Sequence, residues 1–288
     1  METTSSWEDA ISLNSSDTAE MLYLDPAISF MNKATVAKWP AIAEQVCERV
    51  MLDSYPLPLT ADREGYFGDD HFSYWASGLD DWMKVKSKVS EYGVRIESYL
   101  DFGCASGRVI RHAALDPEGG AKVYGCDINQ RHIRWGAKHL PRNLTLFQNT
   151  SIPFLAIESN TLDLVTGYSV FSHIEALETT WLMEIRRILK PGGIAWVTIH
   201  SDHTLLNLNP GWPVHSAVVN HPTYAYLDLS NGMPTDRMVF RWRADKSYSS
   251  NIFYKRSYIE ETWSRIMTIR DFLVSFPNYQ DTVILQKT

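Results

Sequence analysis

The feature that most constrains the fold of this chain is a regular alternation of short apolar runs and helical stretches between residues 95 and 200. Short apolar runs bounded by polar and turn residues are typical of buried strands, whereas apolar residues three or four positions apart are typical of helices. Strands that alternate with helices predict a parallel sheet with right-handed crossovers. The expected strands are Ile96–Asp101, Lys122–Asp127, Leu144–Phe147, Leu162–Gly167 and Ile194–His200.

The end of the chain continues this pattern. The clearest helical stretch of the core, Ala176–Leu189, carries an apolar stripe and is followed by a Gly-Gly stop signal. A further helix is expected at Tyr258–Met267, and two more strand-like runs are Ile269–Val274 and Asp281–Gln286. We therefore expect a doubly wound α/β fold with a mostly parallel, seven-stranded sheet.

Segments outside the alternation predict further parts of the chain. Helical patterns at Lys33–Met51 and His71–Tyr92 precede the core, and Pro40 must lie near an end of the first helix or kink it. A later segment rich in Asn, Pro, Ser and aromatic residues is too long for a structureless loop, so we expect a small fold or lid there. The expected parts are a polar leader (1–30), an N-terminal helical cover (31–94), the α/β core (95–200), an inserted cap or lid (201–251) and a C-terminal helix and strands that complete the sheet (252–288).

Charge and cysteine usage narrow the range of partners. The chain has 27 Lys and Arg against 34 Asp and Glu, a net charge of −7, and no basic block of the kind that nucleic-acid binding needs. It shows no secretory signal and no apolar run of about 20 residues that could span a membrane. Cys47, Cys104 and Cys126 have neither a disulfide pattern nor a zinc spacing. A reducing, cytoplasmic setting is therefore expected.

The segment Leu100–Arg108 is a strand that ends in a tight loop of small residues and opens onto a helix. Gly103 allows the chain to reverse, Ala105 keeps the loop low beneath a ligand, and Gly107 permits close packing of the helix on the strand. Free N–H groups at a helix start favour a carboxylate or phosphate. Asp127 ends the next strand about 24 residues after Gly103, where a carboxylate can hold both ribose hydroxyls. Together these features predict a nucleotide site.

Four motifs, in the same order, resemble those of class I S-adenosylmethionine-dependent methyltransferases. The resemblance covers roughly residues 95–200 and is thin elsewhere. It implies a Rossmann-like fold, S-adenosylmethionine as cofactor and methyl transfer as activity, in the small-molecule branch of the family. The four motifs are Leu100-Asp-Phe-Gly-Cys-Ala-Ser-Gly-Arg108, Tyr124-Gly-Cys-Asp-Ile128, Leu162-Asp-Leu-Val-Thr-Gly-Tyr-Ser-Val-Phe-Ser-His-Ile174 and Ile185-Arg-Arg-Ile-Leu-Lys-Pro-Gly-Gly193.

The resemblance also implies a role for each residue at a matching position. The glycine-rich loop would present its backbone to the methionine part of the cofactor, and Asp127 would hold the ribose. Ile128 and Asn149 would contact the adenine, and Tyr168 and Ser169 would line the methionine part and the start of the acceptor pocket. The implied cofactor-binding residues are Trp75, Asp101, Gly103, Cys104, Ala105, Gly107, Asp127, Ile128, Asn149, Thr150, Tyr168 and Ser169.

Some of these positions depart from the family pattern or have a plainer explanation. Ala105 replaces the usual middle glycine, and Asn149 stands where an Asp is common. Trp75 and Tyr74 could both be core aromatic residues, or one of them could close over the cofactor. Cys104 and Cys126 are expected to be small buried side chains and not nucleophiles, since no activating base lies beside them in sequence.

Methyl transfer is an in-line displacement, so catalysis depends mainly on holding the donor carbon and the acceptor atom in line. An oxygen acceptor also needs a base, and His173 and His200 are the candidates by position. An amine needs only to arrive neutral. A sugar, a lipid-linked compound or a secondary metabolite would all be suitable acceptors. The segment His200-Ser-Asp-His203 is expected to be polar loop and not a metal site.

Three other functions fit parts of the sequence. A nicotinamide dehydrogenase shares the glycine loop and Asp127 but not the Leu189–Gly193 turn. An aminopropyltransferase needs acidic residues where this chain has Tyr168 and Ser169. A non-catalytic binding or scaffold protein could keep the same fold, although the intact loop argues against decay of the site.

Overall fold

The computed structural model describes residues 17–63, 65–242 and 249–288. The described residues divide after Asn149 into two compact units. We call the described residues from 17 to 149 the first unit and those from 150 to 288 the second unit. Among the described residues, none of the helices combines the length and apolar character that crossing a bilayer requires.

The N-terminal part of the first unit packs short elements against one long helix, α4 (His71–Glu91). The expected helix from Lys33 is interrupted at Pro40, which begins a 3-10 turn. Asp70 caps α4, because its side chain accepts a hydrogen bond from the backbone N–H of Ser73. The elements before α4 are β1 (Tyr23–Pro26), η1 (Ala27–Phe30), α2 (Lys33–Val36), η2 (Pro40–Ile42), α3 (Ala43–Leu52), β2 (Pro56–Pro58) and η3 (Thr60–Arg63).

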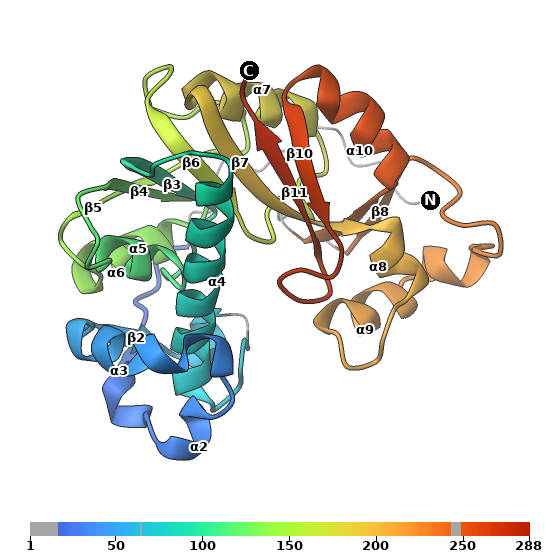
Figure 1. Ribbon diagram of the computed structural model, residues 1–288. Coiled ribbons are helices and arrows are strands. Elements are labelled where there is room, and N and C mark those ends of the chain that lie inside the picture. Colours follow the sequence, from blue (N-terminus) through green and yellow to red (C-terminus); the bar gives the residue numbers. More distant parts are fainter. Residues whose placement is uncertain (1–16, 64, 243–248) are drawn as a thin grey trace. The chain divides into compact units, whose positions relative to one another are not determined.

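The rest of the first unit is a parallel three-stranded array with its crossover helices (Figure 1). Val123 of the middle strand pairs with Tyr99 on one side and Leu144 on the other. The glycine-rich loop leaves the carboxyl end of the first of these strands, as predicted. The elements are β3 (Ser98–Phe102), α5 (Ile110–Ala114), β4 (Lys122–Asp127), α6 (Gln130–His139) and β5 (Leu144–Gln148).

The second unit begins with a parallel pair of strands joined by a helix, and antiparallel strands follow (Figure 1). Its first elements are β6 (Leu162–Gly167), α7 (Glu178–Ile188) and β7 (Leu189–Ser201). Its last elements are α10 (Arg256–Thr262), η5 (Trp263–Arg265), β10 (Thr268–Leu273) and β11 (Asp281–Gln286). β11 pairs antiparallel with both β7 and β10.

The strand order β10-β11-β7-β6-β3-β4-β5 confirms the doubly wound, mostly parallel topology. Two details differ from the sequence expectation. The sheet has nine strands, because β9 (Ser250–Tyr254) pairs with the end of β7 and β8 (Arg237–Arg241) pairs with β9. In addition, β7 begins at Leu189 and not at Ile194. The Gly192-Gly193 segment is part of the strand because its backbone bonds to Lys287, just beyond the end of β11.

The segment after β7 forms ordered structure within its described residues. It contains α8 (Asp202–Leu206), α9 (Pro213–Val219) and η4 (Pro222–Tyr226) before β8 (Figure 1). These elements share an apolar cluster with strand residue Phe253. The segment therefore packs its helices into a small apolar cluster that it shares with β9, and its role as an inserted cap or lid stays a prediction. The buried members of the cluster are Leu205, Val214, Val218, Met233, Met238, Phe240 and Phe253.

Candidate cofactor and acceptor sites

The glycine-rich loop is tied to the end of the neighbouring strand by its own backbone. The N–H groups of Gly103 and Cys104 both donate to the carbonyl oxygen of Cys126, at 2.8 and 2.9 Å. Gly107 has a φ of +84°, and a Cβ placed there would lie 2.4 Å from a methyl carbon of Leu140. A side chain at Gly107 would therefore need both a strained backbone and a displaced neighbour.

Asp127 organises this loop from the tip of β4. One carboxylate oxygen accepts from the N–H of Ala105 at 2.9 Å, and the other accepts from the N–H of Asn129 at 2.7 Å. The residue is 9% exposed. Ala105 itself has a φ of +45°, in the left-handed region that non-glycine residues rarely adopt. The carboxylate thus holds an unfavourable loop conformation in place.

The other predicted cofactor residues of the first unit gather at the same strand ends. Asn149 donates its backbone N–H to the carbonyl oxygen of Asp127 at 3.2 Å. Ile128 is half-buried, and its carbonyl oxygen accepts from the side chain of Gln148 at 2.9 Å. Asp101 is buried in β3. The structure therefore brings Asp127, Ile128 and Asn149 together, as the sequence predicts.

Two neighbouring aromatic residues of α4, Tyr74 and Trp75, have different surroundings. Trp75 is fully buried, and its indole nitrogen donates to Asp53 at 2.7 Å. Tyr74 directs its hydroxyl oxygen to within 3.1 Å of the Ser106 hydroxyl, in the glycine-rich loop. Of the two, Tyr74 is the residue that reaches the loop, whereas the surroundings of Trp75 match its alternative interpretation as a core aromatic residue.

The two cysteines beside the loop have no chemical role that the structure supports. Cys104 and Cys126 are buried and free. Burial raises the pKa of both thiols well above the usual value, and the nearby carboxylate of Asp127 acts in the same direction. The thiolates that nucleophilic chemistry needs are therefore strongly disfavoured. The prediction of small buried side chains is confirmed.

In the second unit, Ser169 lies just beyond β6 in a strained conformation with a φ of +57°. Its N–H donates to the hydroxyl oxygen of Thr198 at 2.7 Å, and its own hydroxyl oxygen accepts from the side-chain amide of Gln280 at 2.9 Å. Thr198 in turn donates to Gln280 at 2.7 Å. This closed network holds the serine in place. Tyr168, the residue before it, is half-buried.

His200 is almost completely buried, and this burial determines its protonation state. Burial and, to a lesser extent, the neighbouring His173 lower its pKa to about 3. The amide nitrogen of Gln280 lies 3.1 Å from its Nε2. Nε2 therefore accepts, and the single proton of the neutral ring sits on Nδ1. Nδ1 is buried and has no hydrogen-bond partner among the residues that the structure describes.

His173 is half-buried, and a backbone carbonyl oxygen determines which of its ring nitrogens carries the proton. Its Nδ1 lies 2.7 Å from the carbonyl oxygen of Ser250, so Nδ1 donates and Nε2 is the basic nitrogen of the neutral ring. The centroids of the His173 and His200 rings are 6.3 Å apart. Tyr279 stacks on His200 with a centroid distance of 5.8 Å, and Trp212 stacks on Tyr279 at 5.6 Å. The two predicted histidines therefore share one aromatic cluster.

Comparison with known families gives this arrangement a context. Residues 100–197 match the family described as a methyltransferase domain. They form a class I S-adenosylmethionine-dependent methyltransferase domain. This confirms the resemblance that the four motifs indicate, and with it S-adenosylmethionine as the methyl donor.

Solved structures of other proteins share the fold. An S-adenosylmethionine-dependent methyltransferase from Methanosarcina mazei is 15% identical, with a TM-score of 0.50 over 69% of this chain and 96% of its own. A putative one from Listeria monocytogenes is also 15% identical, with a TM-score of 0.50 over 74% of this chain and 99% of its own. A Pyrococcus horikoshii protein is 21% identical, with a TM-score of 0.50 over 73% and 90%.

One more predicted cofactor residue, Thr150, follows the end of β5, and its contact with the adenine stays a prediction. Thr150 lies in the turn that follows β5, where its hydroxyl oxygen accepts from the N–H of Ile152 at 3.2 Å. Sequence reasoning missed Gln280, Tyr279 and Thr198, which complete the surroundings of Ser169 and His200. Tyr279 and Gln280 lie far from Ser169 and His200 in the sequence, and no local pattern marks them or Thr198.

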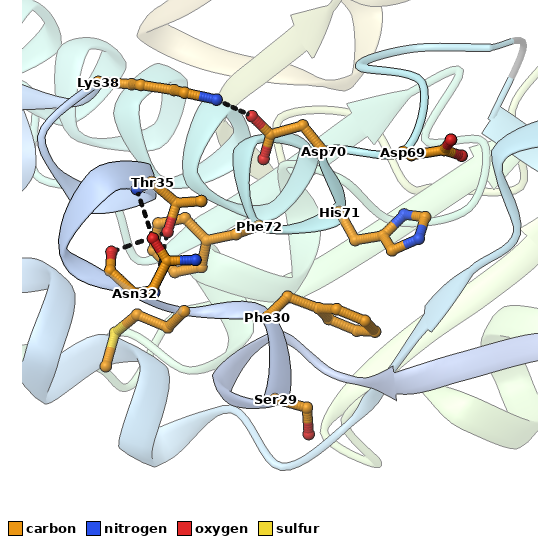
Figure 2. A pocket seen from close by; sticks show the side chains of 10 residues that line it. Ser29, Phe30, Asn32, Thr35, Lys38, Asp69, Asp70, His71 and Phe72 are labelled. Carbon is orange, nitrogen blue, oxygen red and sulfur yellow. Dashed lines mark hydrogen bonds and ion pairs between the residues drawn. The ribbon is translucent and has the colours of Figure 1, made fainter.

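Two further places could be taken for ligand sites. His203 lies with its Nδ1 4.0 Å from Asp281, and in the described part of the chain no three His, Cys, Asp or Glu side chains group as a metal would require. A cavity of about 480 Å³ lies at the start of α4. Figure 2 shows that some of its polar side chains pair with each other, Lys38 with Asp70 and Asn32 with Thr35. These pairs satisfy part of the polarity of the cavity.

Proposed function

We propose that this methyltransferase transfers the methyl group to an oxygen or nitrogen of a small molecule, such as a sugar, a lipid-linked compound or a secondary metabolite. The observation that carries the proposal is the aromatic cluster of His173, His200, Tyr279 and Trp212 in the second unit. Its histidines lie near the carboxyl ends of β6 and β7, the edge at which open α/β sheets bind ligands. Stacked rings with few polar groups suit a small organic acceptor.

The first unit carries residues that fit the cofactor. The low loop from Gly103 to Gly107 would face the methionine part, and the two oxygens of Asp127 would accept from the ribose hydroxyls. Ile128 would pack on the adenine. When bound, S-adenosylmethionine supplies an electrophilic methyl carbon, and the chain's own task is to hold donor and acceptor in line and dry.

The two histidines would divide the work at the acceptor. His173 has a basic Nε2 and would take the proton of an oxygen acceptor. His200 is too weak a base for that role, because its pKa of about 3 leaves little affinity for a proton. It would position the acceptor instead, through its Nδ1–H. A neutral amine acceptor would need no base.

The net charge of −7 supports an acceptor other than nucleic acid. The three free cysteines support a reducing, cytoplasmic setting. Both remain proposals that rest on composition and not on the geometry of the site.

The test is to incubate the purified protein with S-adenosylmethionine labelled in its methyl group and a fractionated cell extract. We expect label in one low-mass organic compound, and none when Asp127→Ala replaces the parent. Label found only in protein or nucleic acid would contradict the proposal, as would label transfer that does not depend on Asp127.

A further inference from the structure

Arg63 is a buried cation without a full set of partners. It lies at the end of η3 in the first unit and is 4% exposed. One terminal nitrogen, Nη2, reaches the carbonyl oxygen of Gly68 at 2.5 Å and the Thr60 hydroxyl oxygen at 3.3 Å. Nε and Nη1 are buried and have no hydrogen-bond partner among the described residues. Buried guanidinium groups in proteins are normally paired, so these N–H groups imply a ligand.

Two acidic residues close to Arg63 in the sequence are engaged with other groups. Asp62 forms an ion pair with Arg131. Asp70 forms an ion pair with Lys38 and caps α4. Burial lowers the pKa of Arg63, and its interactions with Tyr74, Asp69 and Asp70 offset this effect only in part. Within residues 17–63 and 65–149, no carboxylate forms a salt bridge with this guanidinium.

The position of Arg63 places it beside the glycine-rich loop. Its guanidinium carbon lies 4.7 Å from the centre of the Tyr74 ring. The hydroxyl oxygen of that same ring is 3.1 Å from the hydroxyl oxygen of Ser106, inside the loop. The Tyr74 ring therefore contacts both the guanidinium group of Arg63 and the glycine-rich loop, where we place the cofactor.

His71 fixes the guanidinium in this place. Its Nδ1 lies 2.8 Å from Nη2 of Arg63, and since an arginine can only donate, Nδ1 accepts. Burial and the arginine charge both lower the pKa of His71, which favours this neutral form. Figure 2 shows His71 at the edge of the cavity at the start of α4. The contact with His71 uses Nη2 and leaves Nε and Nη1 of Arg63 without a partner among the described residues.

We propose that Arg63 binds the carboxylate of the methionine part of S-adenosylmethionine, through its unpaired N–H groups. This rests on the assignment of the cofactor to the glycine-rich loop. A carboxylate there would satisfy a buried cation, and charge-assisted hydrogen bonds of this kind are the stronger ones. Arg63 would thereby set the position of the methionine chain, and with it the position of the sulfonium.

The test compares two ligands that differ only in the methionine chain, S-adenosylhomocysteine and 5′-methylthioadenosine, by calorimetry. The parent is expected to bind the first more tightly. Arg63→Met should weaken S-adenosylhomocysteine by about tenfold to a hundredfold and leave 5′-methylthioadenosine unchanged. Arg63→Lys, which keeps the charge, should recover part of the loss. Arg95→Met, at a highly exposed arginine, is the control and should change neither affinity.

The outcomes separate the two assignments. Equal losses for both ligands, or no loss for either, would overturn the role of Arg63 while leaving the cofactor site intact. A raised KM for the acceptor with unchanged S-adenosylhomocysteine affinity would also overturn it and would point to an anionic acceptor. A parent that binds neither ligand would overturn the cofactor assignment itself. Thermal unfolding shows whether each variant is folded. If Arg63→Met is not folded, the test rests on Arg63→Lys, which should weaken the binding of S-adenosylhomocysteine but not that of 5′-methylthioadenosine.

Discussion

At the scale of single residues, Ala105 has a strained backbone and also lies in the loop that is proposed to face the ligand. Its φ of +45° costs roughly 1 kcal/mol in an alanine, which glycine would avoid. We therefore expect Ala105→Gly to keep S-adenosylhomocysteine affinity and to match or exceed the parent in thermal stability. Ala105→Leu should abolish binding, since its side chain would occupy the space above the loop. Calorimetry on the two variants checks this, and a leucine variant that binds like the parent would show that the loop does not carry the ligand.

At the residue scale, the sequence predicted the place of Asp127 at the tip of β4, beside the glycine-rich loop, because its strand has a clear apolar pattern. Its contact with the ribose stays a prediction. The choice between Trp75 and Tyr74 was not predictable, because neighbouring residues on a helix point about 100° apart and the sequence does not say which direction faces the loop. Arg63 and Gln280 could not be predicted either, since their significance lies in contacts with distant residues.

At the scale of elements, the packing of α4 against the start of α5 depends on Gly78. A Cβ at this position would lie 1.9 Å from the backbone carbonyl oxygen of Arg108. The helix would have to move away from the glycine-rich loop, so Gly78→Ala should lower the free energy of unfolding by about 2 kcal/mol or more, despite the better helix propensity of alanine.

Urea unfolding measures this effect, and Ser87→Ala is the matched control. Ser87 is an exposed position of the same helix, where alanine should be neutral or slightly stabilising. If Gly78→Ala proved as stable as the parent, the close approach of the helix to Arg108 would be wrong.

Elements with a strong local pattern were predictable, and those that depend on distant pairing were not. Lys122–Asp127, Leu162–Gly167 and Asp281–Gln286 have the bounds that their apolar runs predict. β9 escaped prediction because it exists only through its pairing with the end of β7 and with β8. The early start of β7 at Leu189 has the same kind of cause, because Gly192 and Gly193 bond to Lys287, almost one hundred residues later in the chain.

At the scale of the whole molecule, two fully buried histidines make stability depend on pH. His112 and His200 each have a pKa of about 3 in the folded protein, against an ordinary value of 6.5 for the side chain, chiefly because burial disfavours the charged ring. The charges of Asp53 and Arg111 act on His112 in opposite directions. Between pH 6.5 and 3 the unfolded chain therefore binds more protons than the folded one. Stability is fully present above the ordinary histidine pKa and falls as the pH is lowered.

We expect each of these histidines to remove about 1–2 kcal/mol of stability between about pH 7.5 and about pH 5, a range in which carboxylates contribute little. Urea unfolding at the two pH values measures the change. His112→Gln, which can still hydrogen-bond to the carbonyl oxygen of Trp75, should show a shallower decline. Equal stability at both pH values would mean that these rings are not buried in the neutral form.

The measurement that tests the central claim most directly is calorimetric binding of S-adenosylhomocysteine to the parent, Asp127→Asn and Asp127→Ala. The claim is that a methyltransferase cofactor binds where Asp127 meets the glycine-rich loop. The parent should bind one equivalent, and Asp127→Ala should lose about 1.5–3 kcal/mol of binding free energy with the charge-assisted ribose bonds. Asp127→Asn, which can still accept one bond from Ala105, should lose less. Equal affinity in all three proteins, or no binding by the parent, would contradict the claim.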